Sequence, residues 1–357
     1  MKNLKTQGFV LIDVDVAALN NAGKTENTDL DNGVATKQIR KNGRTFPYVS
    51  GQAWRYWWRN TLQKDFDWSL SPVIRESKIA FTAADPIEYA DDDIFGYMRA
   101  ASEEVTDDKG KVKKENVTVT RVSPLKNSAI ISVASVRPAE NWSSMSRQEG
   151  DAVPYTKQEY SAIMKGMFSL DLEQVGTFAS YNKTGFKNLS EKLRSDAIEK
   201  GATEIVDDHL VGAKGEAHKL VRIAKETRTK RITETIAALK TIGGGAMQTN
   251  NMADVTPKFL ILATMTSGNH PFTHVAINSG IDNATFLLNT EGISEVITDY
   301  AAQFLGTIYI GIRSGFLDKD TSEALKDVVE KHKANVVLTS VNDAIDKYIE
   351  QLISQIP

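Results

Sequence analysis

Cysteine is absent from this sequence of 357 residues, and its absence excludes several kinds of site. A chain without cysteine has no disulfide scaffold, no thiolate metal site and no cysteine nucleophile. It fits a reducing compartment, so we expect a cytoplasmic protein. The apolar run from Phe9 to Leu19 is interrupted by Asp13 and Asp15, which is typical of neither a signal peptide nor a membrane span. We therefore expect no membrane partner.

Motifs that carry catalysis are lacking too. No Gly-x-Ser-x-Gly, zinc or dinucleotide fingerprint is present. His270 and His274 have the spacing of metal ligands on a helix, but Pro271 between them breaks such a helix. Asp13 and Asp15 point to one face of a strand, where they could bind a divalent ion or act as a base; a structural role is the alternative. We predict no catalytic residue, no metal and no cofactor.

A strong positive charge is also lacking, since the formal net charge is −3. Phosphate binding needs clustered Lys and Arg, and an average over the chain can hide a cluster. The segment from Lys37 to Lys64 holds seven basic residues and no acidic one, whereas Asp85 to Asp108 holds nine acidic residues and one basic. This segregation predicts a positive face for a polyanion and a negative face elsewhere; the alternative is two solvated loops of opposite sign.

Hydrophobic periodicity predicts strands interleaved with helices. A strand at Gly8 to Ala18 precedes a long irregular loop, Asn20 to Phe46, and a helix that begins after the N-cap Ser50 and ends near Lys64. We expect further strands at residues 129–136, 168–179, 259–265 and 307–312, and further helices at 188–200, 228–241, 294–304, 321–332 and 341–353. This order fits an α+β sandwich with one helical face.

The length of the chain suggests a central domain that carries insertions. Residues 65–167 have an uneven pattern and are interpreted as one large insertion. Residues from about 201 to 227, which include Gly212 and Gly215, are interpreted as a second, smaller one. The central domain would then be discontinuous, with residues 1–64 and 168–357.

The predicted helix after Ser50 has two different faces. Residues spaced by three and four place polar side chains on one face, namely Gln52, Arg55, Arg59 and Gln63. Trp54, Trp58 and Leu62 share the other face, which we expect to pack in the core. Two arginines one turn apart repel each other unless anions or acids lie opposite. The polar face therefore predicts phosphate binding; the alternative is pairing with acids elsewhere in the chain.

The segment before this helix adds charge near the helix N-terminus, which is itself favourable to anions. Lys37, Arg40 and Arg44 lie in it, and together with the helix they predict a phosphate track. Bound single strands also need aromatic rings between or against their bases. Tyr48, Trp57 and Trp68 are candidates, although a place in the core is the alternative for the tryptophans.

A glycine run ends the second basic helix. Arg228, Lys230 and Arg231 open that helix, and Gly243, Gly244 and Gly245 follow it. One glycine would be an ordinary C-cap, whereas three predict either close approach of the backbone to a ligand or a flexible connector. No Lys-Ser or Lys-Thr follows the run, so it is not a Walker loop.

These segments resemble a known family. The chain is similar to the CRISPR-associated Cas-seven backbone family, of the DevR autoregulator type found in type I-B systems. The resemblance covers most of the chain, and its N-terminal third is the most specific part. The motifs that carry it are Gly8–Val16, Gly33–Lys37, Pro47–Arg55, Asp93–Met98, Arg121–Leu125 and Thr241–Gly245.

The resemblance implies a fold and a function. The expected fold is α+β, with a palm like the ferredoxin-like RNA-recognition motif and insertions that form fingers (65–167) and a thumb (about 201–227). The expected protein is a non-catalytic backbone subunit of a Cascade surveillance complex in antiviral defence. Several copies would polymerise along guide RNA (crRNA) and present it for pairing with a target DNA strand. The other partners would be neighbouring copies and other Cascade subunits.

The resemblance also assigns RNA-binding residues. Ser50, Gln52, Arg55 and Arg59 match the family's helix that grips guide phosphates, and Lys37 matches a nearby basic loop residue. The full predicted RNA-binding set adds Arg40, Arg44, Arg121, Arg231, Gly243, Gly244 and Gly245. The aromatic signature of common palm-type RNA binders is missing, so stacking on the sheet face is not implied.

Two other functions remain open. One is a type III-like backbone subunit that cleaves target RNA with a metal and Asp29 or Asp31, which lie in roughly the right loop. The other is an autoregulator that binds duplex DNA, although no basic helix of the helix-turn-helix kind is evident.

Overall fold

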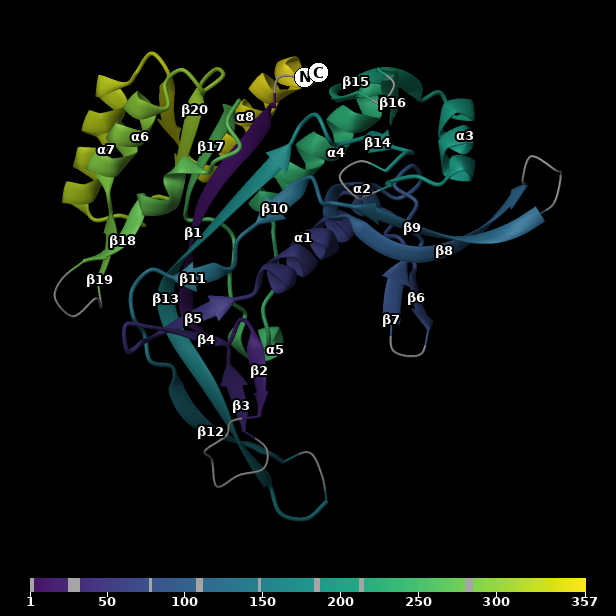
Figure 1. Ribbon diagram of the computed structural model, residues 1–357. Coiled ribbons are helices and arrows are strands. Elements are labelled where there is room, and N and C mark those ends of the chain that lie inside the picture. Colours follow the sequence, from purple (N-terminus) through teal and green to yellow (C-terminus); the bar gives the residue numbers. More distant parts are fainter. Residues whose placement is uncertain are drawn as a thin grey trace.

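The computed structural model describes residues 3–24, 33–76, 79–106, 112–146, 149–182, 187–211, 215–279 and 285–357. The protein has an α+β fold, as the sequence predicts, built around a large and mostly antiparallel sheet (Figure 1). Within these residues no helix is long and apolar enough to cross a membrane. Asp29 and Asp31 lie outside the described residues.

The large sheet has twelve strands, and most of them lie in the order β21-β20-β17-β1-β13-β11-β5-β4. Along this path only β20 and β21 are parallel. Its strands are β1 (Lys5–Ala17), β2 (Asn21–Lys24), β3 (Val34–Thr36), β4 (Gln38–Lys41), β5 (Arg44–Val49), β10 (Leu125–Asn127), β11 (Ile130–Ser132), β12 (Ala139–Met145), β13 (Val153–Asp171), β17 (Phe259–Met265), β20 (Ile308–Ile312) and β21 (Val336–Thr339).

Four smaller sheets surround it. They are formed by β6 (Val73–Glu76) with β7 (Ile79–Thr82), by β8 (Tyr97–Thr106) with β9 (Val112–Arg121), by β14 (Thr177–Ala179) with β15 (Thr203–Val211) and β16 (Ala217–Arg222), and by β18 (Ala276–Ser279) with β19 (Thr285–Leu288). The helices are α1 (Gly51–Asp65), α2 (Ala90–Phe95), α3 (Glu191–Glu199), α4 (Lys225–Ala237), α5 (Gln248–Asn251), α6 (Thr290–Asp299), α7 (Lys319–Lys331) and α8 (Val341–Gln355), with short 3-10 turns η1 (Ala238–Lys240) and η2 (Pro271–His274).

The central strand β1 is buried on both faces because helices cover both sides of the sheet. Phe9 and Leu11 point into a core with residues of α6 and α7. Val10 and Ile12 point the other way, into a core with residues of α1, α4 and α8. Successive residues of a strand face opposite sides, so one strand contributes to two cores. The expectation of a single helical face is therefore wrong.

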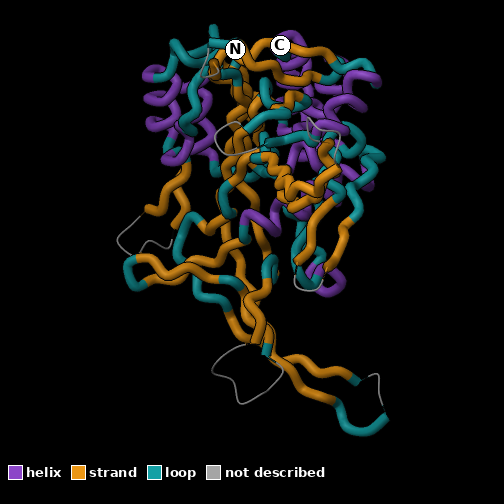
Figure 2. The backbone as a smooth tube through the Cα atoms, turned by 45° about the vertical axis from the view of Figure 1, so that its right-hand side comes forward, coloured by secondary structure: helices purple, strands orange, loops and turns teal. Residues whose placement is uncertain are grey.

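Strand β13 continues beyond the body of the sheet and forms an arm with β12. It pairs with β1 from Tyr160 to Asp171 and with β12 from Val153 to Glu159. Figures 1 and 2 both show this hairpin projecting from the rest of the molecule. A bulge at Val16, whose φ is 40°, interrupts the pairing of β1 where the arm begins.

The elements predicted from the sequence agree best with the structure where the hydrophobic pattern is long. β17 has the predicted bounds, and Ser50 caps α1 by accepting a hydrogen bond from the Ala53 N–H (3.3 Å). The predicted loop from Asn20 to Phe46 is wrong for its described part, which contains β2, β3, β4 and the start of β5. Asn42 and Gly43, with φ of 50° and 74°, form the turn between β4 and β5, as Asn-Gly does in two-residue hairpins.

Candidate nucleic-acid interface

The hairpin of β4 and β5 presents basic side chains to solvent. All four residues of β4 are exposed, including Arg40 and Lys41, and Arg44 follows at the start of β5. Within the described parts of the chain, neither Arg40 nor Lys41 has an acidic partner. The hairpin is therefore a positive surface in a protein whose net charge is negative.

Lys165 extends this positive surface onto the large sheet. Its Nζ donates to the carbonyl oxygens of Thr273 (3.0 Å) and Ala276 (2.9 Å). Burial, and next the nearby charge of Lys41, lower the pKa of Lys165. An anion close to both ammonium groups would offset their mutual repulsion. No pattern in the sequence marked Lys165, because only the fold brings β13 near the hairpin.

The N-terminus of α1 lies beside the hairpin because β5 leads directly into the helix. Asn20 joins the two: its carbonyl accepts from the Lys37 N–H (2.8 Å) and its Oδ1 accepts from the Ser50 N–H (3.0 Å). The structure thus brings Lys37, Ser50 and Gln52 together, as the sequence predicts. Gln52 is exposed and Lys37 is half-buried.

The two arginines of α1 are engaged within the protein. Arg55 donates to the carbonyl oxygens of Leu125 (2.6 Å) and Phe95 (2.5 Å) and to the side chains of Asn127 and Ser123. Burial, followed by the nearby Arg59, lowers the pKa of Arg55 to about 10. These bonds leave Arg55 little capacity for a phosphate, so its predicted RNA contact is not supported by this geometry.

Arg59 pairs with the buried carboxylate of Asp91 in α2 at 2.6 Å. Arg59 therefore has the acidic partner that the sequence left open as the alternative, whereas Arg55 is held by carbonyl oxygens and neutral side chains. The side chain of Arg59 is 26% exposed, so one edge of its guanidinium is within reach of solvent.

A different face of α1 is open to solvent. It is the stripe Gln52, Tyr56, Asn60 and Lys64, whose spacing of four places the side chains in line. Tyr56 is the most exposed aromatic of the helix, at 66%. Trp54, Trp57 and Trp58 are buried, as is Trp68, so the core interpretation holds for all four tryptophans.

The glycine run packs against α1. A Cβ on Gly244 would lie 2.2 Å from Cγ of Trp57, so only glycine fits there. Gly245 has a φ of 113°, and the Gly243 N–H donates to the Thr61 hydroxyl (3.3 Å). The three glycines predicted close approach to a ligand or a flexible connector, whereas Gly244 closely approaches an indole ring of the protein itself.

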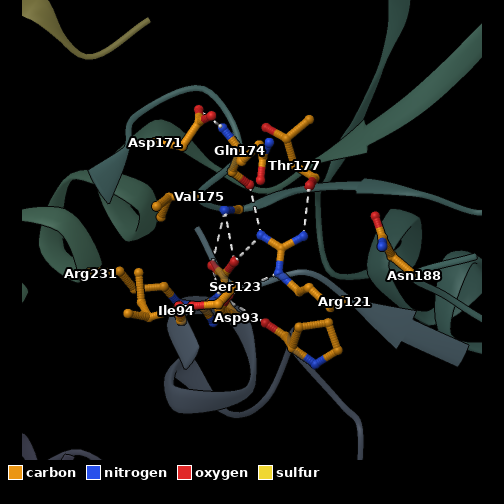
Figure 3. Close-up of polar contacts among 12 residues, drawn as sticks. Asp93, Ile94, Arg121, Ser123, Asp171, Gln174, Val175, Thr177, Asn188 and Arg231 are labelled. Carbon is orange, nitrogen blue, oxygen red and sulfur yellow. Dashed lines mark hydrogen bonds and ion pairs between the residues drawn. The ribbon is translucent and has the colours of Figure 1, made fainter. Parts of the chain in front are cut away.

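Arg121 and Arg231 lie in a buried cluster around Asp93 of α2 (Figure 3). Both guanidiniums pair with the Asp93 carboxylate, Arg231 at 2.8 Å. Arg121 also donates to the carbonyl oxygens of Asp93, Gln174 and Thr177, and Arg231 donates to those of Pro86 and Ile87. The prediction that these two arginines contact RNA conflicts with their burial, because a strand outside the protein cannot reach them.

The acidic segment is also placed differently from the prediction. Asp91, Asp92 and Asp93 are buried, so they do not form a separate negative face. Burial raises the pKa of Asp92. Asp85 is half-buried, and Glu88 is exposed and pairs with Lys200 (3.3 Å). The other four predicted acids, Glu103, Glu104, Asp107 and Asp108, lie outside the residues whose side chains are described.

Of the two histidines with metal-like spacing, which were not predicted to bind a metal, His270 is engaged within the protein. His270 is largely buried, and its Nε2 lies 2.9 Å from the Gly8 carbonyl oxygen. Burial lowers its pKa. No group of three or more His, Cys, Asp or Glu side chains that could hold a metal occurs among the described residues.

Comparison with known families assigns the chain. Residues 10–284 match the family described as CRISPR-associated negative auto-regulator DevR/Csa2. This chain belongs to the DevR/Csa2 family. The family resemblance found in the sequence is thereby confirmed, and the protein is CRISPR-associated.

Other comparisons of this DevR/Csa2 protein are more distant. Two chains of solved structures align with nearly all of it at 10% identity. One, from a "CRISPR RNA-guided surveillance complex", has a TM-score of 0.46 and covers 98% of this chain and 99% of its own. The other, from a "CRISPR RNA-guided surveillance complex, pre-nicking", has a TM-score of 0.45 and covers 97% and 99%. No curated protein matches the sequence.

Proposed function

We propose that this protein is a non-catalytic, guide-RNA-binding backbone subunit of a type I Cascade surveillance complex. Its large sheet would serve as the RNA-recognition-motif-like palm. Residues 65–167, predicted as the fingers, contribute β10, β11, β12 and most of β13 to this sheet, so the fingers would be the parts of 65–167 outside it. The thumb would be the predicted insertion at about 201–227. Copies of the chain would polymerise along crRNA and present it to a target DNA strand. Membership of the DevR/Csa2 family supports a role in CRISPR defence.

The observation that carries the RNA-binding proposal is the exposed basic hairpin beside the N-terminus of α1. Arg40, Lys41 and Arg44 lie on it, and Lys37 precedes it. No acidic residue occurs between Gly33 and Lys64 to neutralise this surface from within the segment. Clustered cations of this kind bind the phosphates of a strand independently of its sequence.

A salt titration of RNA binding tests the proposal. Replacing Arg40 and Lys41 together by Ala should weaken binding of single-stranded RNA of any sequence about equally. Each lost phosphate contact should reduce the slope of log affinity against log salt by roughly 0.7. The matched control replaces Lys319 and Lys326 of α7, which removes the same charge from exposed positions on another element. An unchanged slope in the hairpin variant would refute RNA binding at the hairpin.

Two assays on the same purified protein distinguish the proposed function from the nuclease and the DNA-binding autoregulator. A metal-dependent nuclease would cut a paired target RNA at regular intervals when Mg²⁺ is added, and Asp29→Ala or Asp31→Ala would abolish the products. An autoregulator, a role that the family description names, would bind duplex DNA without RNA. We expect neither result.

A further inference from the structure

A pocket of about 370 Å³ opens between α1 and the glycine run, on the exposed stripe of the helix. It lies apart from the arginines of α1, whose donors are directed toward α2 and the segment from Phe95 to Asn127. Tyr56 and Trp57 supply aromatic walls, and Gly244 closes the pocket against the Trp57 indole. A side chain at position 244 would displace that indole, so the shape of the pocket depends on the glycine.

The polar groups of the pocket suit a neutral planar ligand better than a phosphate. Asn60, Lys64 and Asp65 line it, so a cation and a carboxylate are both present. Asp65 accepts a hydrogen bond from the Thr241 hydroxyl (2.5 Å) and would repel a phosphate. Within the described chain, the Asn60 amide and the Lys64 ammonium have no hydrogen-bond or ion-pair partner. The Asn60 amide, which carries both donors and an acceptor, can therefore hydrogen-bond to the edge of a base that lies against the Tyr56 ring.

We propose that this pocket holds one base of the bound RNA strand, stacked on Tyr56, with its edge toward Asn60. This inference rests on the proposed RNA binding. It adds a contact with a base, whereas the contacts proposed for the hairpin are with phosphates. Tyr56 is suited to stacking because its ring is exposed while its backbone is fixed in a helix. Bases that are splayed out of a single strand are commonly held by an aromatic face and hydrogen bonds to their edges.

The test uses a short single-stranded RNA with 2-aminopurine placed at successive positions, and the full-length protein. With the wild-type protein, the fluorescence should be quenched at one position that stacks on Tyr56. Tyr56→Ala should abolish the quenching and weaken binding by about 5- to 150-fold, the range for losing one stacked base. Tyr56→Phe keeps the ring and should behave as the wild type. Tyr300→Ala, which removes a half-buried tyrosine at the C-terminal end of α6, outside the pocket, is the matched control.

The salt dependence separates this proposal from the function on which it rests. Tyr56→Ala removes no phosphate contact, so the slope of log affinity against log salt should stay unchanged, whereas the hairpin variant should lower it. Unaltered affinity and quenching in Tyr56→Ala, with RNA still bound, would overturn the pocket proposal and leave the function standing. Failure of the wild-type protein to bind RNA would overturn both.

Discussion

Asp93 lies where four segments of the chain meet. Its carboxylate accepts from Arg121 of β9, from Arg231 of α4 and from the Gly176 N–H (2.9 Å) in the turn before β14, while Asp93 itself belongs to α2. The carboxylate is fully buried, and both arginines are nearly so. A buried carboxylate with two buried cations holds together parts of the chain that are 28 to 138 residues apart in sequence.

Asp93→Asn should destabilise the protein strongly. The substitution keeps the size of the side chain but leaves two buried guanidiniums without a counter-charge, which costs about 3–5 kcal/mol. Unfolding in urea measures the change. Asp67→Asn is the control, because Asp67 is exposed and its φ of 54° is one that Asn tolerates. A loss below about 1 kcal/mol for Asp93→Asn would contradict the role assigned to this carboxylate.

The roles of individual arginines could not be predicted from the sequence. The spacing of Arg55 and Arg59 correctly predicts that they share a side of α1. It cannot tell whether that side meets solvent or the acids of α2, because Asp91 is 32 residues away and is placed by tertiary packing. The exposed stripe of Gln52, Tyr56, Asn60 and Lys64 was missed for the same reason.

At the scale of elements, the glycine run and α1 form one packed unit. Gly244→Ala should destabilise the protein by about 1–3 kcal/mol, because the new Cβ would meet the Trp57 ring and force it to move. Gly243→Ala is the matched control. At that position the nearest atom to a new Cβ is the Thr241 carbonyl oxygen at 3.8 Å, and we expect little change.

Urea unfolding compares the two glycine variants, and near-ultraviolet circular dichroism reports on the Trp57 environment. Equal stabilities for Gly244→Ala and Gly243→Ala would show that the ring can move without cost. The close approach at Gly244 would then not explain why glycine stands there.

Elements with strong local signals could be predicted from the sequence. Helix α1 has its cap and amphipathic pattern within its own residues, and β17 is a continuous apolar run. The strands between Asn20 and Val49 have weak local signals and form by pairing with each other and with β11 and β13. The Asn42-Gly43 turn was the one local signal that could have revealed a hairpin there.

At the scale of the whole molecule, charge is unevenly distributed. The segment from Lys37 to Lys64, with the basic hairpin and all but the last residue of α1, has seven basic residues and no acid. Residues 290–357, with α6, α7 and α8, have eleven acidic and six basic residues. In Figure 1 α6 and α7 lie at the upper left and β4 and β5 lie below them, so these two sets of charges are on separate parts of the molecule. This uneven distribution of charge replaces the negative face predicted for Asp85 to Asp108, because Asp91, Asp92 and Asp93 of that segment are buried.

Opposite charges on separate parts of the surface favour a head-to-tail contact between copies, which does not close on itself. We expect several copies to assemble on one guide-length RNA, and the assembly to weaken as salt is raised. Light scattering at saturating protein measures the mass of the complex. A mass that corresponds to one copy per RNA, at low salt, would contradict assembly along the strand.

Strand β13 belongs both to the large sheet and to the arm, and this restricts how the length of the arm can change within the family. Its 19 residues are shared between the arm and the middle of the sheet, without a break between them. One residue inserted at the junction would turn every arm side chain to the opposite side while the sheet kept its register. Two residues would restore the original facing and move the tip outward by about 6.6 Å. The reach of the arm can therefore vary among relatives in paired steps, and odd steps require a compensating bulge.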